Sequence, residues 1–539
     1  RLLMTDPGEA WFGCVDLKYG EDGSVKVLEL GDGLTSGFTG SGAFIPRAYS
    51  ALGKRRRKLG PFLDAVIENK VMSHDAMVDA QLSDLRPPAQ AFQRHYSYSL
   101  PRDVLAAVGR GPCVLKLADR QRGCGVVAVN PGDIEKTLQA LLEVPEPPME
   151  ESSSSLPSDA AGSGEIMVHW AEQAREAAAL HGLKEQVRHW QADECPSFIA
   201  EGLCRSKLVK GSDGRLYDGT LRVGFSLEGE TVRLLGSYWK LPDAAADDTK
   251  VDLSTRIVSH THGGSGTRAC AAEDEKAVWT ILEPALLKIF CANIMHLTVP
   301  GLLERYEHDN MLLIVALTRV AAGRIETDVG EAEKLLLLVE QMVQDYEDAP
   351  GNGVISYVKR TRGTLAARQK GGNPDWQAGA SFYQEAVAKM PTNAAASYLS
   401  GMAYLNKGNY LKAGELFAQS VTADCDFACA YNQLATVCLL MGDSFSCLEI
   451  CEAMLARHDR IAAGHHQIAV ALYNQEAEAN AKGRVNASRR SKAAACLKRA
   501  KELQRGKSWG LEEDDMLEAL EKDAPLAKRK VRTWLFHAW

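Results

Sequence analysis

The amino-acid sequence predicts a multidomain protein, in which an α+β region ending near residue 345 precedes an all-α region built from helical repeats. Three observations support this fold class. A chain of 539 residues is too long for one hydrophobic core, since a single core rarely extends past about 250 residues. Short apolar segments separated by Gly and Asp turns are typical of strands and recur up to about residue 240. From Glu273 onward the apolar residues have helical spacing, and the later part of this pattern repeats at a constant period.

The composition narrows the classes of protein to which the chain can belong. Hydrophobic residues make up 45% of the chain and charged residues 24%, as in an ordinary globular protein. The net charge of −8 argues against a dedicated nucleic-acid binder. The longest apolar run, Met311–Leu317, is far shorter than the roughly 20 residues of a membrane span, and no signal peptide is recognisable. Thirteen cysteines without regular spacing indicate reduced thiols, so we expect a cytoplasmic protein.

The α+β region, residues 1–345, is expected to form the first domain. Helical patterns occur near Pro61–Asp79 and Arg102–Val108, and again at Ile166–Trp190. Residues 145–165 are rich in Pro, Ser and Gly and lack bulky apolar side chains, which predicts a disordered insertion. Three segments have the character of strands: Ser197–Leu203, Leu221–Leu227 and Val232–Tyr238.

Residues 346–510 contain a repeated pattern with a period of about 34 residues. The repeat aligns small residues at one position, namely Gly379, Ala413 and Cys447. It aligns larger residues at another, namely Tyr383, Phe417 and Cys451. With the small-Gly-x-x-Tyr pattern at Gly401–Tyr404, the units resemble the tetratricopeptide repeat, whose concave groove implies a protein or peptide partner. An insertion at Gln475–Ser491 interrupts the last unit, and residues 511–539 are expected to form a capping helix or a tail.

A lysine and a glycine loop mark the first candidate site, in "CVLKLADRQRGCGVVAV" at Cys113–Val129. A buried ammonium such as that of Lys116 is costly unless it meets an anion or water. A glycine loop directly after it, with Gly123 and Gly125, offers backbone N–H groups that can close over phosphate oxygens. It is not a Walker A loop, because Gly-Lys-Ser/Thr is absent. The alternative is an ordinary β-hairpin whose lysine extends to solvent.

Two later predicted strands give further support for a nucleotide site. Glu201 ends the predicted strand "SFIAEGL", and Arg222 lies within "YDGTLRVGFSL". The order of lysine, glycine loop, acidic strand and arginine strand resembles the ATP-grasp superfamily. "KLADRQRGCGV" is also similar to the "K-P-x-D-x-x-R-G-x-G-I" element of its tubulin-tyrosine-ligase-like branch, with Leu117 in place of the proline.

This resemblance implies a role for each matched residue. Lys116 and Arg122 would bind ATP phosphates, and the loop of Gly123, Cys124 and Gly125 would cover them. Glu201 and Leu203 would contact the adenosine, and Arg222 would stabilise the transferred phosphoryl group.

A candidate metal site precedes the lysine in the sequence. Asp16 and Glu29 are 13 residues apart, and "LELGDGLTS" is similar to the ATP-grasp tail "E-x-N-x-x-P-G-x-T". Two carboxylates on adjacent strands suit Mg²⁺. Gly31 replaces the usual asparagine ligand, and the metal strand precedes the lysine, as in the circularly permuted eukaryotic glutathione synthetase. Alternatively, Arg1–Gly42 is the tail of an earlier ATP-grasp unit, or the pair lies in a simple hairpin.

Other polar residues give weaker signals. His260 and His262 alternate before a Gly-rich turn, so they could bind a metal, although a solvated loop is the simpler interpretation. Lys240 lies beside an aromatic pair, where packing is favoured over a contact with substrate or phosphate. Cys447 and Cys451 share a helix face and are interpreted as core thiols.

Three functional hypotheses follow. The first is an ATP- and Mg²⁺-dependent ligase of ATP-grasp type that joins a carboxylate to an amine or thiol through an acyl phosphate, with tetratricopeptide repeats that bind a protein. The second is a degenerate ATP-grasp domain on a repeat scaffold that acts as an interaction protein, which Gly31 favours. The third is a small-molecule kinase on the same fold. Neither the substrate nor the repeat's partner is specified by the sequence.

Overall fold

The chain forms two compact units in the computed structural model. The first comprises residues 1–144 and 182–365, and the second comprises residues 145–181 and 366–539. The structure describes residues 9–32, 55–56, 69–120, 124–143, 163–228, 231–258, 266–292, 299–307, 309–345, 349–368, 374–504, 511–522 and 526. Residues 144–162, which hold most of the predicted disordered insertion, and residues 527–539 of the predicted tail lie outside this set.

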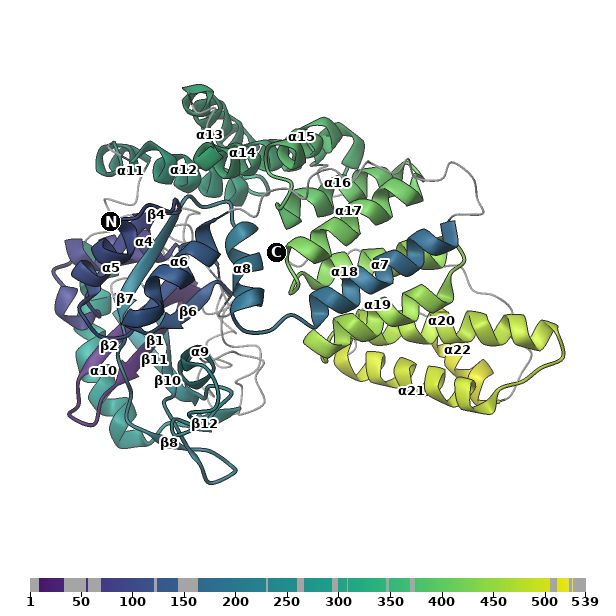
Figure 1. Cartoon of the computed structure of the whole chain (residues 1–539), viewed down its shortest axis with the longest axis horizontal. Helices are drawn as coiled ribbons and strands as arrows, with labels where there is room; N and C mark the ends of the chain where they lie inside the picture. Colours follow the sequence, from purple (N-terminus) through teal and green to yellow (C-terminus); the bar gives the residue numbers. More distant parts are fainter. Residues whose placement is uncertain are drawn as a thin grey trace. The chain divides into compact units, whose positions relative to one another are not determined.

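The first unit is an α/β region with two antiparallel sheets at its centre (Figure 1). The larger sheet has the strand order β12–β11–β10–β1–β2: Thr267–Ala269, Thr231–Lys240, Thr220–Glu228, Glu9–Tyr19 and Val25–Asp32. The short strand β3 (Arg55–Arg56) pairs with β1 in parallel. In register, Asp16 on β1 lies between Arg222 on β10 and Glu29 on β2.

The smaller sheet has the strand order β4–β7–β5–β6: Ala89–Gln93, Ser197–Gly202, Cys113–Leu117 and Val126–Val129. The predicted apolar runs around the glycine loop are therefore β5 and β6, which pair as an antiparallel hairpin. Alternate residues of a strand point to opposite faces. On β5, Leu115 and Leu117 accordingly pack in a core with the helices α5 (Leu100–Val108), α6 (Ile134–Leu142) and α8 (Leu183–Gln191), whereas Lys116 points to the other face. A separate two-stranded ribbon consists of β8 (Val209–Lys210) and β9 (Leu216–Tyr217).

Helices cover both sheets of the first unit. They are α4 (Lys70–Asp79), α5 (Leu100–Val108), α6 (Ile134–Leu142), α8 (Leu183–Gln191), α9 (Leu253–Ile257), α10 (Ala272–Leu287), α11 (Val299–Arg305), α12 (Asn310–Arg324), α13 (Val329–Met342) and α14 (Ala349–Ala367). A π-helical turn, η4 (Lys288–Ala292), extends α10, and short 3₁₀ turns occur at η1 (Ser83–Leu85), η2 (Pro131–Asp133) and η6 (Val343–Asp345). Helix α10 covers one face of the larger sheet, and α11–α14 share a core with α4 and β7.

The helical pattern predicted over Ile166–Trp190 is confirmed, with one break. The segment forms two helices, α7 (Ser163–Ala178) and α8, which are separated at Gly182. Gly182, the N-cap of α8, has φ +62°, a conformation that glycine adopts without steric cost and that lies outside the helical region. Helix α7 belongs to the second unit and α8 to the first.

The second unit is all-helical, as predicted, and its helix bounds recur at the period of the sequence repeat. Its helices are α7, α15 (Trp376–Lys389), α16 (Ala394–Asn406), α17 (Tyr410–Ala423), α18 (Ala428–Leu440), α19 (Ser444–Arg457), α20 (Ala462–Ala481), α21 (Ala487–Gln504) and α22 (Leu511–Glu521). The N-cap residues of α15, α17 and α19 recur at the same spacing, and the side chains of Asp375, Asn409 and Asp443 each accept backbone N–H groups. The predicted insertion near residue 475 is largely an extension of α20 to 20 residues.

The residues predicted to fill the repeat are its core. Tyr383, Phe417 and Cys451 are fully buried, as are Ala413 and Cys447. A Cβ atom on Gly401 would lie 2.7 Å from the Phe417 ring, so a small residue is needed where these helices cross. The cysteines at these positions are core thiols, and burial raises the pKa of Cys447.

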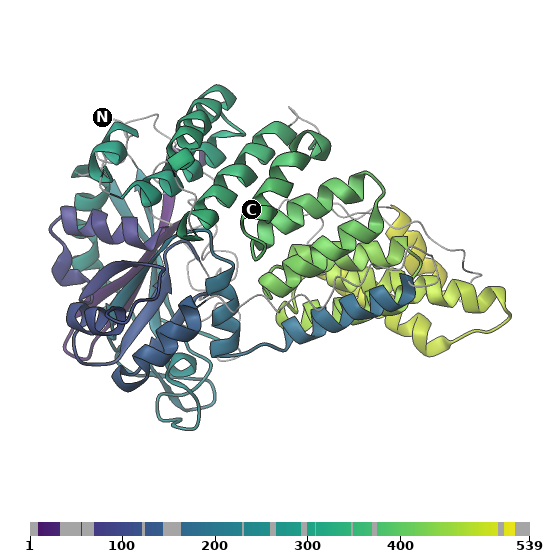
Figure 2. The same cartoon turned by 45° about the horizontal axis from the view of Figure 1, so that its top comes forward.

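Helix α7 packs against α17 and α19 although it lies far before them in the sequence (Figures 1 and 2). Its apolar residues Met167, Trp170, Ala171 and Ala174 form one helical face that joins the repeat core. Beyond its C-terminus, Arg457 of α19 donates to the backbone carbonyl of Leu180 at 3.0 Å. The inserted segment thus completes the second unit, which the sequence did not reveal.

We expect Gly414→Ala to destabilise the second unit by about 2 kcal/mol, because overpacking outweighs the better helix propensity of alanine. A Cβ atom at this position would lie 2.2 Å from the Trp170 ring, which is rigid and buried. Calorimetry should show a lower unfolding temperature for this variant than for the exposed control Glu415→Ala. Adding Trp170→Phe, whose shorter side chain lacks the outer indole atoms that obstruct the Cβ, should recover part of the loss. No recovery would contradict this packing.

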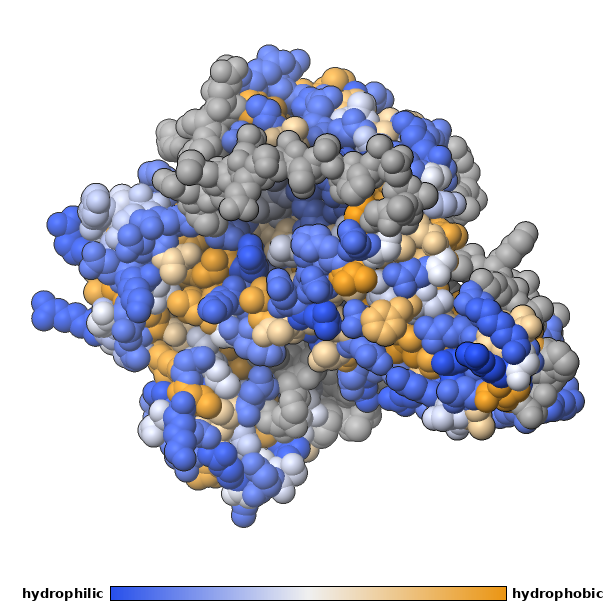
Figure 3. All heavy atoms as spheres, turned by 45° about the vertical axis from the view of Figure 1, so that its right-hand side comes forward, coloured by the Kyte–Doolittle hydropathy of each residue, from blue (hydrophilic) through white to orange (hydrophobic). Residues whose placement is uncertain are grey.

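The described part of the chain contains no helix that is long and apolar enough to cross a membrane. On the face drawn in Figure 3, hydrophobic residues occupy small areas between hydrophilic ones. Exposed apolar side chains of this scattered kind are normal for a protein surface in water.

Candidate functional site

A cleft of about 1050 Å³, counting space open to solvent, lies between the two sheets of the first unit. Six residues predicted as site residues line it: Asp16, Glu29, Lys116, Glu201, Leu203 and Arg222. They come from both sheets and are up to 206 residues apart in the sequence. The structure therefore brings the predicted lysine, acidic strand, arginine and carboxylate pair into one cleft.

On the smaller sheet, Lys116 is held by Glu201. The lysine Nζ donates to Oε2 of Glu201 at 2.5 Å, and Arg86 donates to Oε1 of the same carboxylate at 2.5 Å. Burial would raise the pKa of Glu201, but the charges of Lys116 and Arg86 outweigh it and lower the pKa. Glu201 is thus a charged carboxylate that positions Lys116, and its predicted contact with adenosine stays a prediction.

On the larger sheet, Asp16 is held by two cations. Arg222 donates to both of its carboxylate oxygens, at 2.6 and 2.7 Å, and Lys240 donates to Oδ2 at 2.6 Å. Burial alone would raise the pKa of Asp16, but the charges of Arg222 and Lys240 lower it. Lys240, for which the sequence favoured packing, is therefore a cleft residue.

Two further lysines that line the cleft, Lys18 and Lys70, were not predicted from the sequence. Lys18 donates to Oδ1 of Asp218 at 2.9 Å, and Lys70 lies 3.5 Å from Glu29. Lys18 could have been found, because it is two residues after Asp16 on the same strand and so shares its face. Lys70 gave no signal, because it begins a helix far from any recognised motif.

The charges of the cleft favour an anionic ligand. Among the described residues that line it, six are cations and three are carboxylates, although the whole chain has a net charge of −8. Apolar side chains that could contact a flat ring also line the cleft: Leu28, Val114, Val126, Leu203, Ile257 and Val258. A basic region beside an apolar one suits a ligand that joins phosphates to an aromatic base.

The two carboxylates predicted as magnesium ligands have the right chemistry but are already paired with cations. Asp16 and Glu29 are cross-strand neighbours and offer the hard oxygen donors that this ion prefers. Both oxygens of Asp16 accept hydrogen bonds from cations, so it could bind a metal only if Arg222 or Lys240 turned to another anion. Gly31, at the position of the expected asparagine ligand, also lines the cleft and offers no side chain.

The glycine loop is described only at its ends. Arg122 and Gly123 lie outside the described residues, as do His260 and His262. Cys124 and Gly125 are described but do not line the cleft. Gly125 has φ +71°, and a Cβ atom there would lie 2.3 Å from Leu117, so this position requires glycine for structural reasons.

Next to the site, His74 of α4 gives a pH-dependent prediction. Burial and the charge of Arg86 lower its pKa from 6.5 to about 4. Between these values the unfolded chain binds more protons than the folded one, so stability falls as the pH drops through this range. We expect the urea midpoint of the first unit to fall between pH 7 and pH 5.

His74→Gln should reduce this pH dependence, whereas the exposed control His95→Gln should leave it unchanged. Urea unfolding at several pH values, followed by circular dichroism, provides the measurement. Equal pH dependence in wild type and His74→Gln would exclude His74 as its cause.

Comparisons with known proteins give little further information. None of the protein-family models matches the chain, and no curated protein matches it. A solved structure titled "Crystal structure of MamA" is 17% identical, with a TM-score of 0.26, and covers 34% of this chain and 94% of its own. A second, "MamA MSR-1 C2", is 16% identical with a TM-score of 0.26 and covers 36% of this chain and 97% of its own. Matches with TM-scores this low do not establish the fold of any part of this chain.

Proposed function

We propose that the first unit is an ATP-grasp-like domain that binds ATP with Mg²⁺ in the cleft and acts as a carboxylate ligase. The observation that carries the proposal is the convergence of Lys116, Glu201, Arg222, Asp16 and Glu29 on one basic cleft between two antiparallel sheets. A hairpin with a solvated lysine, the simpler alternative, is at odds with a lysine that is 7% exposed and paired with a buried carboxylate.

The ligase reaction would proceed in two steps. A substrate carboxylate oxygen attacks the γ-phosphorus of ATP, the bond from that phosphorus to the β,γ-bridging oxygen breaks, and ADP leaves. An amine or thiol then attacks the carbonyl carbon of the acyl phosphate, phosphate leaves, and the nucleophile loses its proton.

The side chains of the cleft would orient the reactants. Lys116, held in place by Glu201, would bind phosphate oxygens, and Arg222 would turn from Asp16 to the transferred phosphoryl group. Lys240 would neutralise the substrate carboxylate or the phosphate that it receives. Asp16 and Glu29 would hold Mg²⁺, which would neutralise phosphate charge.

The second unit would be a tetratricopeptide array that recruits a protein or peptide. The constant period of its helix bounds and N-caps supports this assignment. A second candidate function, an inactive ATP-grasp relic that serves as a scaffold, is favoured by Gly31 and by the two cations on Asp16.

The test is calorimetric titration of the full chain with ATP and MgCl₂, followed by assays of ADP release with pooled carboxylates and amines or thiols. Binding with product formation supports the ligase. Binding without ADP release for any acceptor, protein substrates included, supports the scaffold. Absence of any nucleotide binding would contradict the assignment of the cleft.

A further inference from the structure

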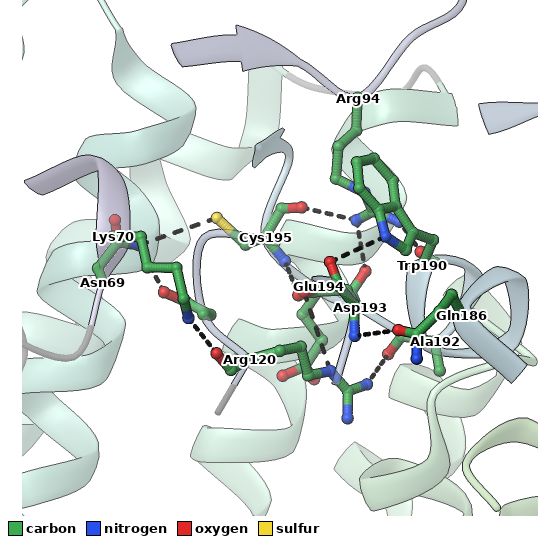
Figure 4. Close-up of polar contacts among 12 residues, drawn as sticks. Asn69, Lys70, Arg94, Arg120, Gln186, Trp190, Ala192, Asp193, Glu194 and Cys195 are labelled. Atoms are coloured by element: carbon green, nitrogen blue, oxygen red, sulfur yellow. Dashed lines mark hydrogen bonds and ion pairs between the residues drawn. The ribbon is translucent and has the colours of Figure 1, made fainter. Parts of the chain in front are cut away.

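Lys70 is a cleft lysine to which neither the predicted motifs nor the proposed reaction gives a role. It is the first residue of α4, its side chain is 4% exposed, and it lines the cleft. Its backbone N–H donates to the carbonyl of Ala118 at 2.8 Å, and its Nζ donates to the carbonyl of Arg120 (Figure 4). The preceding residue, Asn69, caps the helix and donates through Nδ2 to Asp119. The lysine therefore enters the cleft from a fixed point of the backbone.

The start of a helix is an unfavourable place for a buried cation. The N-terminal end of a helix carries a partial positive charge, and the first turn of α4 contains no acidic residue that would offset it. A buried ammonium at this end needs an anion close by. An anionic ligand beside Lys70 would meet the charge of the ammonium and the positive end of the helix together.

Glu29 is the carboxylate that faces Lys70, and it meets this need only in part. Nζ of Lys70 lies 3.5 Å from Oε1 of Glu29, which is longer than a charge-assisted hydrogen bond. The Glu29 side chain is 34% exposed, so water and salt weaken the pair. The other lysines in the described lining of the cleft, Lys18, Lys116 and Lys240, lie 2.5–2.9 Å from buried carboxylates. The Lys70–Glu29 pair is therefore the one among these four that exchanges partners most readily.

We propose that Lys70 is a phosphate-binding residue whose ammonium competes with Mg²⁺ for Glu29. Lys70 leaves Glu29 when the metal binds there together with ATP, and its ammonium then donates to a phosphate oxygen. The inference rests on the proposed function, because it assigns Glu29 to the metal and the cleft to ATP. The exchange couples metal binding to nucleotide binding, since the carboxylate and the ammonium each gain a new partner of opposite charge.

Two effects of opposite sign follow from removing the charge of Lys70. Loss of the competing cation leaves Glu29 more accessible to a divalent metal, so a metal ion alone binds more tightly. Loss of the phosphate contact weakens nucleotide binding. A lysine with a purely structural role would weaken both kinds of binding or change neither.

The test compares Lys70→Gln, which removes the charge but keeps an N–H donor for the Arg120 carbonyl, with Lys70→Arg, which keeps the charge. Lys210→Met, at an exposed position of the same unit, is the control. Binding of Mn²⁺, a paramagnetic substitute for Mg²⁺, to the full chain is measured by electron paramagnetic resonance without nucleotide. Calorimetric titration gives the Kd of the non-hydrolysable analogue AMP-PNP with MgCl₂, and circular dichroism verifies folding.

We expect Lys70→Gln to lower the Kd for Mn²⁺ about five-fold and to raise the Kd for AMP-PNP about ten-fold, with Lys70→Arg and Lys210→Met close to wild type. Adding Glu29→Gln should abolish the gain in Mn²⁺ affinity. Mn²⁺ affinity that does not rise in Lys70→Gln, or a rise that survives Glu29→Gln, would overturn the competition for Glu29. An unchanged Kd for AMP-PNP would overturn the phosphate contact.

Two outcomes need a separate measurement. If wild type fails to bind AMP-PNP, the proposed function fails, whereas Mn²⁺ binding still decides whether Lys70 competes for Glu29. If Lys70→Gln is poorly folded, Glu29→Gln alone provides the test. It releases Lys70 and should lower the Kd for AMP-PNP in EDTA, and an unchanged Kd would overturn the inference.

Discussion

Lys116→Met is expected to raise the Kd for ATP with Mg²⁺ by about 100-fold and to abolish turnover. The lysine lines the cleft, is buried, and is aligned by a salt bridge to Glu201. Removing one charge of a desolvated contact costs roughly 2–5 kcal/mol, and each 1.4 kcal/mol is tenfold in affinity. Methionine keeps much of the side-chain volume, so the loss reflects charge rather than a cavity.

The structure also supplies the controls for this variant. Arg86 continues to pair with Glu201, so the buried carboxylate keeps a partner and the fold is expected to persist. Lys210→Met, at an exposed position of the same unit, should bind ATP like wild type. Calorimetric titration gives the Kd, and circular dichroism verifies folding. Equal affinity of Lys116→Met and wild type for ATP would show that Lys116 does not contact the nucleotide. The β5–β6 hairpin would then have no role in ATP binding through this lysine.

Local chemistry made much of the candidate site predictable. A lysine in an apolar run and the closely spaced carboxylates Asp16 and Glu29 are short-range patterns, and six of the predicted residues share the cleft. The repeat was predictable because its period recurs in helix bounds and N-caps. In each case the signal lies within a short stretch of sequence.

Long-range pairing was not predictable from one sequence. Nothing in the sequence shows that Asp16 neighbours Arg222, 206 residues away, so the sequence predicts them as separate parts of the site. The packing of α7 against α17 and α19 was not predicted for the same reason. An apolar helix face does not by itself specify which core it joins. The pairing of Glu201 with Lys116 likewise depends on β7 lying beside β5.

The Asp16–Arg222–Lys240 cluster leads to the second large effect. We expect Asp16→Asn to lower the free energy of unfolding of the first unit by about 3 kcal/mol, because it leaves two buried cations without their shared anion. Urea unfolding, followed by circular dichroism, measures the loss. The exposed control Asp247→Asn should have little effect.

Two further measurements separate this electrostatic cause from general damage to the fold. Adding Arg222→Met to Asp16→Asn should cost less free energy of unfolding than the sum of the two single variants, because of the two cations only Lys240 then remains. Burial lowers the pKa of Lys240, so this lysine can lose its charge more easily.

The folded-state pKa of Asp16 lies below its ordinary value of 3.8. The pair therefore stabilises the fold above that pH and is lost progressively below it. The difference between wild type and Asp16→Asn should be constant from pH 5 to 8 and shrink below about pH 4. Strict additivity and a pH-independent difference would instead indicate that Asp16 contributes packing rather than charge.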